Sequence, residues 1–259
     1  MTSWDEKQLH WHLTTRRFGR QFQYFDETDS TNRWLIEHPE AFTLTGAVAI
    51  ASHQTAGRGR HLRSWLDSPG SGLLCSVMLQ LRTKHLAKGF LSMIPAIALA
   101  RSIKKHDPAA EIALKWPNDV LLSHKKVAGI LAESTIHAGV EIVVVGIGVN
   151  LYSVPIGDFI WPATSLRENS NWHPVREILL AELLNNWEPL YDLFLDKDYD
   201  ALRVAWEEFG PRRGARMKRV ESPNVIEGEF EGLGENGQLL LRDAEGVIQE
   251  VYSGDVLPG

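Results

Sequence analysis

Apolar residues recur along the chain with two periods, which predict strands and helices in alternation. Short apolar runs bounded by turn-forming residues predict strands at 22–25, 46–52, 73–81, 112–115, 120–122, 127–133 and 141–149. Helical spacing predicts helices over 89–105, 175–195 and 199–209. A further helix is expected to begin near Ser30 or Thr31, because capping residues there precede an apolar face.

The pattern changes at residues 211–214, where Pro-Arg-Arg-Gly ends the helical periodicity. Residues 215–259 contain short alternating segments separated by turns, among them Asn236-Gly237, a pair typical of β-hairpins. Turns this closely spaced indicate a small β-barrel. We therefore expect a body of mixed helices and strands over residues 1–211 and a β-domain over 212–259.

Composition and charge exclude several classes of protein. The chain is 44 % apolar and 23 % charged, as expected of a globular protein, and its formal net charge of −6 disfavours electrostatic binding of nucleic acid. The single cysteine, Cys75, cannot form an internal disulfide, which fits a reducing compartment. No apolar run reaches the ~20 residues of a membrane-spanning helix, and the N-terminal residues are too polar for a signal peptide. We expect a cytoplasmic protein without membrane contacts.

Residues 54–65 join two predicted strands and alternate glycine with arginine at Arg58 and Arg60, with Arg63 following. Glycine lets backbone N–H groups converge on an anion, and guanidinium groups bind carboxylate or phosphate oxygens in pairs. Repulsion among the three cations predicts a loop that stays mobile until an anionic ligand binds. The composition alone fits a solvated basic loop equally well. The segment lacks the Gly-Lys-Ser/Thr ending of a P-loop and the helix-opening glycines of a dinucleotide site.

Three more segments place charged residues or glycines within predicted strands or in the turns that join them. Lys115 and Asp119 flank a turn, where the cation suits a phosphate and the carboxylate suits a metal or an amine. In the strand that follows, strict alternation predicts Lys126 and Gly129 on opposite faces. Glycine within a strand often marks the close approach of a ligand, and residues 146–150 repeat this feature. Each segment also has a purely structural interpretation, as a polar turn, a turn lysine or a packing glycine.

Taken together, the segments resemble one enzyme family. Residues 29–32 (DSTN), 54–65 (QTAGRGRHLRSW), 115–119 (KWPND), 126–131 (KVAGIL) and 146–150 (GIGVN) occur in the order and approximate spacing of the biotin protein ligases. The resemblance covers residues 22–259. It implies an α+β fold, with a mixed-sheet catalytic domain of the class II synthetase-like, biotin–lipoyl ligase type and a C-terminal SH3-like β-barrel.

The resemblance implies a reaction in two steps. The carboxylate of biotin attacks the α-phosphorus of ATP in the presence of Mg²⁺, giving biotinyl-5′-AMP and pyrophosphate. A lysine of the biotin carboxyl carrier protein, a subunit of acetyl-CoA carboxylase, then attacks this anhydride. Fixed cations suit the first step because charge builds on the phosphoryl oxygens. A loop ordered over the adenylate would exclude water.

Site residues are carried over by position. The resemblance implies catalytic roles for Arg58, Arg60, Lys115, Asp119 and Lys126. It implies biotin binding by Ser30, Thr31, Asn32, Gln54, Arg58, Gly59, Arg60, Lys126 and Gly129. It implies nucleotide binding by Arg63, Trp65, Asn118, Asn150 and Trp161. The resemblance leaves open how Lys115 and Asp119 share the binding of phosphate, of a metal and of the acceptor lysine. Asp119 is the candidate for contact with Mg²⁺.

Two departures and several alternatives complete the sequence-based expectations. Leu62 stands where many relatives have glycine, so the arginine loop is expected to be stiffer there. Few residues precede the first predicted strand at residue 22, so we expect neither an N-terminal DNA-binding domain nor a repressor function. The alternatives are a lipoate or octanoate ligase, a biotin-sensing DNA-binding regulator and an interaction module with an inactive body. Both a monomer and a homodimer fit the sequence.

Overall fold

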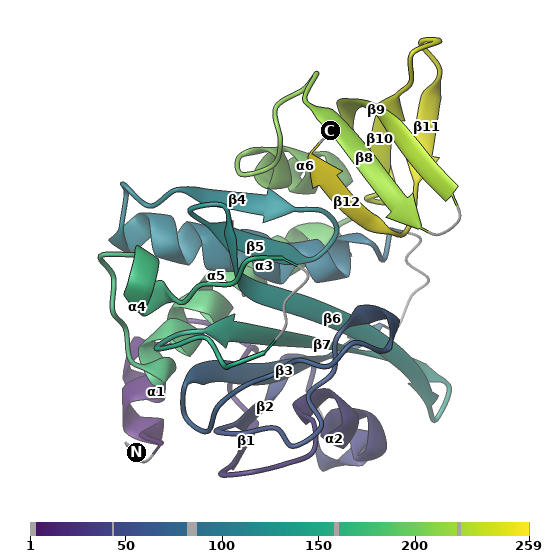
Figure 1. Cartoon of the computed structure of the whole chain (residues 1–259). Coiled ribbons are helices and arrows are strands. Elements are labelled where there is room, and N and C mark those ends of the chain that lie inside the picture. Colours follow the sequence, from purple (N-terminus) through teal and green to yellow (C-terminus); the bar gives the residue numbers. More distant parts are fainter. Residues whose placement is uncertain (1–3, 43, 82–86, 158–160, 222–223, 259) are drawn as a thin grey trace.

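The computed structural model describes residues 4–42, 44–81, 87–157, 161–221 and 224–258, in which a helix-covered mixed sheet precedes a second sheet (Figure 1). The first sheet has seven strands in the order β1-β2-β3-β7-β6-β5-β4. These strands are β1 (Phe22–Phe25), β2 (Ala47–Ala51), β3 (Gly72–Leu81), β4 (Ile112–Lys115), β5 (Asp119–Leu122), β6 (Lys125–His137) and β7 (Val140–Asn150). β1 and β2 pair in parallel and the other neighbours are antiparallel. The α+β class and the mixed sheet are confirmed.

The helices cover the two faces of this sheet unequally. They are α1 (Glu6–His12), α2 (Thr31–Glu37), α3 (Phe90–His106), α4 (Leu166–Asn169), α5 (Arg176–Leu195) and α6 (Tyr199–Glu207), with short 3-10 turns η1 (Pro39–Ala41) and η2 (Arg60–Leu62). On β3, alternate residues such as Val77 join the main core with α3 and α5, whereas Met78 packs with Leu35 of α2 in a smaller cluster. Because α2 is short, much of the second face is left for the arginine loop to cover.

The alternation predicted for β6 is wrong in one respect that matters for the site. The pairing of β5 with β6 shifts by one residue, so Val120 pairs with Ala128 while Leu121 pairs with Lys126. Val127 is the extra residue of a β-bulge, which reverses the phase of the strand. A Cβ added to Gly129 would lie 3.0 Å from Lys126 Cε, so both residues lie on the same face. Strict alternation cannot anticipate this, since the extra residue appears only in the pairing with β5.

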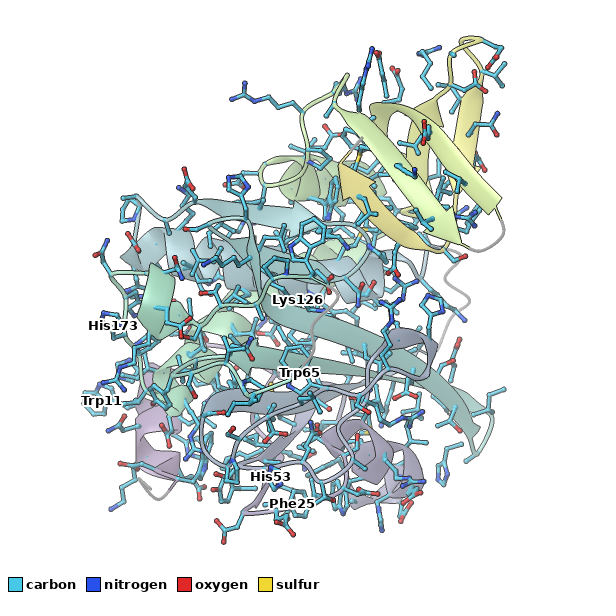
Figure 2. The ribbon with its side chains drawn as sticks, in the orientation of Figure 1. Trp11, Phe25, His53, Trp65, Lys126 and His173 are labelled. Carbon is cyan, nitrogen blue, oxygen red and sulfur yellow. The ribbon has the colours of Figure 1, made fainter. Side chains whose placement is uncertain are left out.

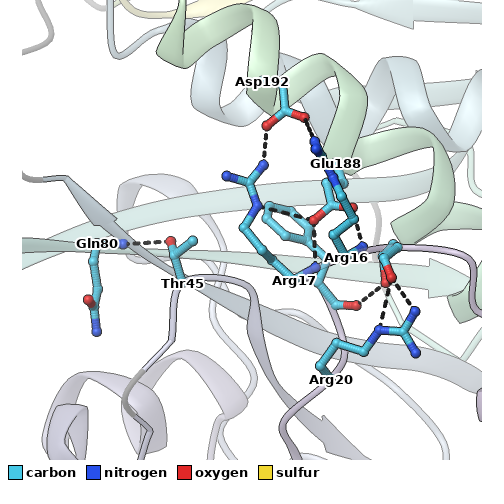
Figure 3. A network of polar contacts seen from close by, with 9 residues as sticks. Arg16, Arg17, Arg20, Thr45, Gln80, Glu188 and Asp192 are labelled. Atoms are coloured by element: carbon cyan, nitrogen blue, oxygen red, sulfur yellow. Dashed lines mark hydrogen bonds and ion pairs between the residues drawn. The ribbon is translucent and has the colours of Figure 1, made fainter.

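The N-terminal residues contain a helix that the apolar pattern does not predict. Asp5 caps α1 through its side chain, and α1 packs along α5. The chain that follows is anchored on α5, where the backbone N–H groups of Arg16 and Arg17 donate to the two oxygens of Glu188 at 2.6 and 2.7 Å (Figure 3). Both arginine side chains also contact Asp192. The helix depends on this tertiary anchoring and not on a long apolar stripe of its own.

The second sheet is antiparallel, with five strands in the order β11-β10-β9-β8-β12, and it lies at one end of the molecule beside α6 (Figure 1). Its strands are β8 (Arg216–Glu221), β9 (Asn224–Leu233), β10 (Leu239–Arg242), β11 (Ile248–Val251) and β12 (Asp255–Pro258). The predicted hairpin joins β9 to β10, and Gly237 in its connection has φ +80. Indole Nε1 of Trp116 in the body donates to the carbonyl of Gly237 at 3.0 Å.

The limits 1–211 and 212–259, and the closure of the second sheet into an SH3-like barrel, stay predictions. In the residues that the structure describes, no helix has the length and apolar character needed to cross a bilayer.

Candidate active site

A cavity of about 430 Å³ gathers the residues predicted to form the site. Its lining includes Ser30, Thr31, Asn32, Gln54, Arg58, Gly59, Arg60, Arg63, Trp65, Lys115, Asn118, Asp119, Lys126, Gly129, Asn150 and Trp161. They come from segments far apart in the sequence, and the sheet brings them together because β4, β5, β6 and β7 are neighbours. The structure therefore places every residue of the sequence-based site beside one cavity, without showing what each one binds.

At one end of the cavity, a single carboxylate lies between two ammonium groups. Asp119 Oδ1 is 2.7 Å from Lys126 Nζ, and its Oδ2 is 3.7 Å from Lys115 Nζ. The register explains the arrangement, since Asp119 pairs with Lys115 on β4 and with Gly129 on β6. The bulge at Val127 then turns Lys126 to the same face. Two cations held by one anion leave a net positive charge that an anionic ligand can neutralise.

The middle of the cavity is formed by two glycines beneath an indole ring. Gly129 and Gly148 are paired across β6 and β7, and a Cβ on Gly148 would lie 2.3 Å from the ring of Trp65. The ring also faces Lys126, whose Nζ lies 5.7 Å from the ring centroid; both residues are labelled in Figure 2. The absence of side chains at the two glycines lets Trp65 of the arginine loop approach the backbone of the sheet.

The other end of the cavity is polar and formed largely by neutral groups. The backbone N–H of Thr31 donates to Gln54 Oε1 at 2.8 Å, and the Thr31 hydroxyl lies 2.6 Å from Ser76 Oγ. Ser76 donates to Asn32 Oδ1 at 2.6 Å. Asn32 lies over Gly146, where a Cβ would come within 2.2 Å of Asn32 Oδ1. Ser30, the N-cap of α2, accepts from a backbone N–H of its own helix.

The three arginines of the loop each have a polar partner. Arg58 Nη2 lies 2.7 Å from Glu133 Oε1, and Arg60 Nη1 lies 3.4 Å from Asn118 Oδ1. Arg63 meets Asp255 of β12 at 2.6 Å. The hydrogen bond from Arg63 lowers the pKa of Asp255 below its ordinary value, while partial burial opposes the shift.

The expectation of a mobile loop rested on repulsion among the arginines alone. In the structure, Glu133 and Asp255 supply counter-charges from strands that the sequence does not connect with the loop. The loop is further closed by backbone hydrogen bonds between residues 57–59 and 63–65. The side chain of Leu62, which raised the question of loop stiffness, lies outside the described part of the structure.

The remaining predicted residues connect the end of the cavity that holds Lys115 and Lys126 to neighbouring segments. Asn118 donates to the carbonyl of Ile130 at 2.6 Å and so ties the β4–β5 turn to β6. Asn150 donates to the carbonyl of Thr164 at 3.0 Å. Trp161 lies over Lys115, whose Nζ is 5.2 Å from the ring centroid. These contacts hold the lysines and the tryptophan at the same end of the cavity.

Three polar residues at the site were missed by the sequence analysis: Ser76, Glu133 and Asp255. Ser76 lies within a run most of whose residues are buried in the core, and Glu133 is the last residue of a predicted strand. Asp255 lies on the second sheet and still lines the cavity. The local sequence holds little to separate them from other polar positions, because each acquires its place through strand pairing or packing between the two sheets.

Neither the carboxylates of the cavity nor their neighbours form a cage for a metal. Within the ranges that the structure describes, no cluster of three or more histidine, cysteine, aspartate or glutamate side chains could hold a metal ion. Asp119 and Asp255 line the cavity, and each already contacts a cationic side chain. Mg²⁺ keeps several waters and is usually bound through one or two carboxylates together with substrate phosphates. The two carboxylates of this cavity are a donor set that fits a Mg²⁺ ion held mainly by the phosphates of a substrate.

Comparisons with known proteins match both parts of the chain. Residues 24–150 match the biotin/lipoate A/B protein ligase family, and residues 216–257 match the biotin protein ligase C-terminal domain. The chain is 35 % identical over 232 residues to the biotin–(acetyl-CoA-carboxylase) ligase of Paracoccus denitrificans, covering 85 % of this chain and 93 % of the relative. It is 32 % identical over 271 residues to the enzyme of that name from Mycobacterium tuberculosis, covering 98 % and 95 %.

A solved structure agrees with the sequence relatives. The biotin protein ligase from Aquifex aeolicus, in complex with biotin and ATP, superimposes with a TM-score of 0.77 at 27 % identity, over 93 % of this chain and all (100 %) of that one. The agreement extends over the body and the second sheet, since almost the whole chain is covered. The chain is therefore a ligase and belongs to the biotin protein ligase family.

Proposed function

We propose that this chain joins biotin and ATP to form biotinyl-5′-AMP and then transfers the biotinyl group to one lysine of a biotin carboxyl carrier protein. One observation carries the proposal: a single cavity has the Lys115–Asp119–Lys126 cluster at one end and a chain of mostly uncharged hydrogen-bonding groups at the other. A ligand with an anionic end and a neutral polar ring fits such a cavity. The names of the relatives support biotin as that ligand.

The first step needs two anions to be brought together. Biotin carboxylate and the α-phosphate of ATP repel each other in water, and Lys126 and Lys115 would hold their oxygens at the charged end of the cavity. The negative charge that develops on the phosphoryl oxygens as the new C–O–P linkage forms would be stabilised by the same ammonium groups. Mg²⁺ would supply further counter-charge on the ATP phosphates, with Asp119 as its contact. The ring faces of Trp65 and Trp161 would pack against the nucleotide.

The ring end has a different requirement. The fused ureido ring of biotin carries N–H donors and a carbonyl acceptor but no charge. Ser30, Thr31 and Gln54 offer neutral polar groups at this end of the cavity. A small number of such groups is enough to orient a ligand in a pocket. We place Gly59 and Gly129 where the backbone would approach the ligand.

The second step needs the mixed anhydride to survive until the acceptor lysine arrives. Arg58, Arg60 and the rest of the loop would cover the adenylate and exclude water. The lysine amine then attacks the acyl carbon, the C–O bond to AMP breaks, and the amine loses a proton. Asp119 is the carboxylate held between the two lysines, and we propose that it orients the incoming amine once the phosphate of the adenylate has offset the charges of Lys115 and Lys126.

Biotin-dependent exchange of pyrophosphate with ATP tests the first step, and mass spectrometry of a biotin carrier domain tests the second. We expect exchange with biotin but not with lipoate or octanoate, and a mass increase at one lysine that disappears when that lysine is replaced by arginine. Pyrophosphate exchange that depends on lipoate and not on biotin would overturn the proposal and would indicate a lipoate ligase.

We further propose that the chain acts in the cytoplasm and without a repressor function. The negative net charge supports the second part, since DNA binding is driven largely by contacts between cationic side chains and phosphates. A gel-shift assay at moderate salt, with and without biotinyl-5′-AMP, is expected to show no specific complex. A sequence-specific shift that requires the adenylate would overturn this part while leaving the ligase proposal intact.

A further inference from the structure

Glu133 of β6 joins two parts of the site and has no role in the reaction proposed above. Its Oε1 lies 2.7 Å from Arg58 Nη2, and its Oε2 accepts a hydrogen bond from Asn32 Nδ2 at 2.9 Å. The carboxylate is one-fifth (20 %) exposed, and Asn32 is 4 % exposed. A carboxylate with a donor facing each oxygen acts only as an acceptor. Glu133 therefore favours one orientation of the buried amide of Asn32.

The orientation of the Asn32 amide decides which group donates in its hydrogen bond with Ser76. Asn32 Nδ2 donates to Glu133 and also lies 3.2 Å from the carbonyl of Leu131, so both neighbours on that side are acceptors. Asn32 Oδ1 must then face Ser76, whose hydroxyl donates to it at 2.6 Å. A hydroxyl has one proton, so Ser76 has only lone pairs left for its other neighbour.

That neighbour is Thr31, which lines the cavity. Its hydroxyl lies 2.6 Å from Ser76 Oγ and 3.1 Å from Gln54 Oε1, and both atoms are acceptors in this arrangement. The one proton of the Thr31 hydroxyl is therefore used within the protein whichever acceptor it takes. Toward a ligand, Thr31 presents lone pairs only.

We propose that Glu133 is a positioning residue which, through Asn32 and Ser76, makes Thr31 an acceptor and so selects a ring that offers an N–H at that point. The inference rests on the proposed function, because it takes the cyclic urea of biotin as the ring. A ring atom that carries a lone pair instead of N–H would face the lone pairs of Thr31, and a buried polar contact without a proton is costly. Arg58 supplies the counter-charge that Glu133 needs in this partly buried place.

Glu133→Gln tests the proposal with almost no change in shape. A glutamine offers one acceptor and one donor, so it cannot accept from both Asn32 and Arg58. We expect mixed orientations of the Asn32 amide, after which Thr31 can donate to the ligand in part of the population. Glu141→Gln is the matched control, because Glu141 lies on the same β6–β7 hairpin, is paired with Lys88 at 2.6 Å and lies outside the cavity lining.

The ligands are biotin and its two cyclic-carbamate analogues, in each of which oxygen replaces one ring N–H. Calorimetry gives a Kd for each ligand with each protein. For wild type and Glu141→Gln we expect one of the two analogues to bind at least about tenfold more weakly than biotin. In Glu133→Gln we expect the ratio of the Kd of that analogue to the Kd of biotin to fall several-fold. A merely structural role would weaken biotin and both analogues alike and leave the ratio unchanged, which would overturn the proposal.

A second variant keeps the test decisive if Glu133→Gln does not fold. Ser76→Ala removes the closer acceptor of the Thr31 proton and leaves Gln54 Oε1 at 3.1 Å, a more distant partner with which an acceptor on the ligand can compete, so the ratio is expected to fall in the same direction. An unchanged ratio in Ser76→Ala would contradict the proposal that the hydrogen bonds from Glu133 through Asn32 and Ser76 to Thr31 cause the selectivity. Failure of the proposed function looks different, since wild type would then bind no biotin and show no biotin-dependent exchange.

Discussion

At the scale of single residues, the charged end of the cavity depends on one carboxylate. Asp119 is 13 % exposed, and its two lysine neighbours are 14 and 28 % exposed, so the cluster is shielded from much of the solvent that screens surface ion pairs. The ammonium groups are therefore held in place before a ligand arrives. Such preorganised charge stabilises a transition state without a reorganisation cost at the moment of reaction.

Lys126→Ala is expected to remove most of the first-step rate. The loss of one preorganised cation typically lowers kcat by about a hundredfold or more. Biotin-dependent pyrophosphate exchange measures the effect, and Lys88→Ala, which removes a half-exposed lysine paired outside the cavity, provides the control. Exchange close to the wild-type rate in Lys126→Ala would contradict the role given to this residue.

Gly148→Ala is expected to displace the indole of Trp65. The added methyl would overlap the ring at 2.3 Å, so the arginine loop must shift outward. We expect the KM for ATP to rise by about tenfold, on the basis that small displacements of positioning groups are costly. In the Trp65→Ala background the same substitution meets no ring, and its additional effect should disappear. An equal effect in both backgrounds would mean that the strain lies elsewhere.

At the scale of elements, the arginine loop is held by three parts of the chain. Glu133 of β6 holds Arg58, Asn118 of the β4–β5 turn meets Arg60, and Asp255 of β12 holds Arg63. The first two contacts lie within the body, and the third joins the loop to the second sheet. The C-terminal strands are thereby linked to loop closure as well as to the lining of the cavity.

Asp255→Asn is expected to loosen the loop without unfolding the protein. The Arg63–Asp255 pair is 46 and 35 % exposed, so we expect less than about 1 kcal/mol of lost stability. Adenylate should leak several-fold faster, as measured by release of labelled biotinyl-5′-AMP. Arg63→Ala should have the same effect, and the double variant should be no worse than either single one. Additive effects would show that the two side chains act separately.

The pH dependence of this contact has a defined sign. The pKa of Asp255 is lowered by the hydrogen bond from Arg63. The contribution of the contact to stability is therefore present above the ordinary value of 3.8 and is lost as the pH falls through the lowered pKa. Leakage from wild type should be constant around neutral pH for this reason, and a rise between pH 7 and pH 6 would point to another group.

At the scale of the whole molecule, the ends of the chain are fastened to the body by polar contacts. Glu188 of α5 receives two backbone N–H groups from the N-terminal segment and a contact from the Arg17 side chain. Burial of Glu188 opposes its ionisation, but these donors outweigh burial and lower its pKa. At the other end, Trp116 reaches Gly237, and Trp206 of α6 packs against Phe230 of β9. Arg16, Arg17 and Glu188 of the first anchor are not among the residues that line the cavity.

Glu188→Gln is expected to destabilise the fold while leaving catalysis by the folded protein unchanged. Replacing a buried charge that holds several donors costs about 2–3 kcal/mol, which urea unfolding at pH 7 would measure. Because the pKa of Glu188 is lowered, the difference from wild type should persist above 4.5 and shrink as the pH falls through the lowered pKa. An equal difference at pH 7 and at pH 3 would show that the charge is not the cause.

Most of the elements follow from the sequence alone, and the residues predicted for the site lie together along one cavity. Short apolar runs bounded by turn-forming residues predict β1 through β7 to within a few residues, and the capping residue Ser30 predicts the start of α2. These features are local, since strand alternation, helix capping and turn chemistry depend on neighbouring residues. The motifs that resemble the biotin protein ligases also name the cations and glycines that line the cavity. Helix α1 was missed because its stability comes from contacts with α5.

The arrangement of these residues was decided only in the folded chain. The bulge at Val127 places Lys126 and Gly129 on one face, and it arises from the pairing of β6 with β5. Ser76, Glu133 and Asp255 reach the site because strands distant in sequence become neighbours. Local patterns record the character of each residue, whereas register and packing join positions as far apart in the sequence as Arg63 and Asp255. The direction of hydrogen bonds and the pairing of charges are therefore decided only after the sheets have formed.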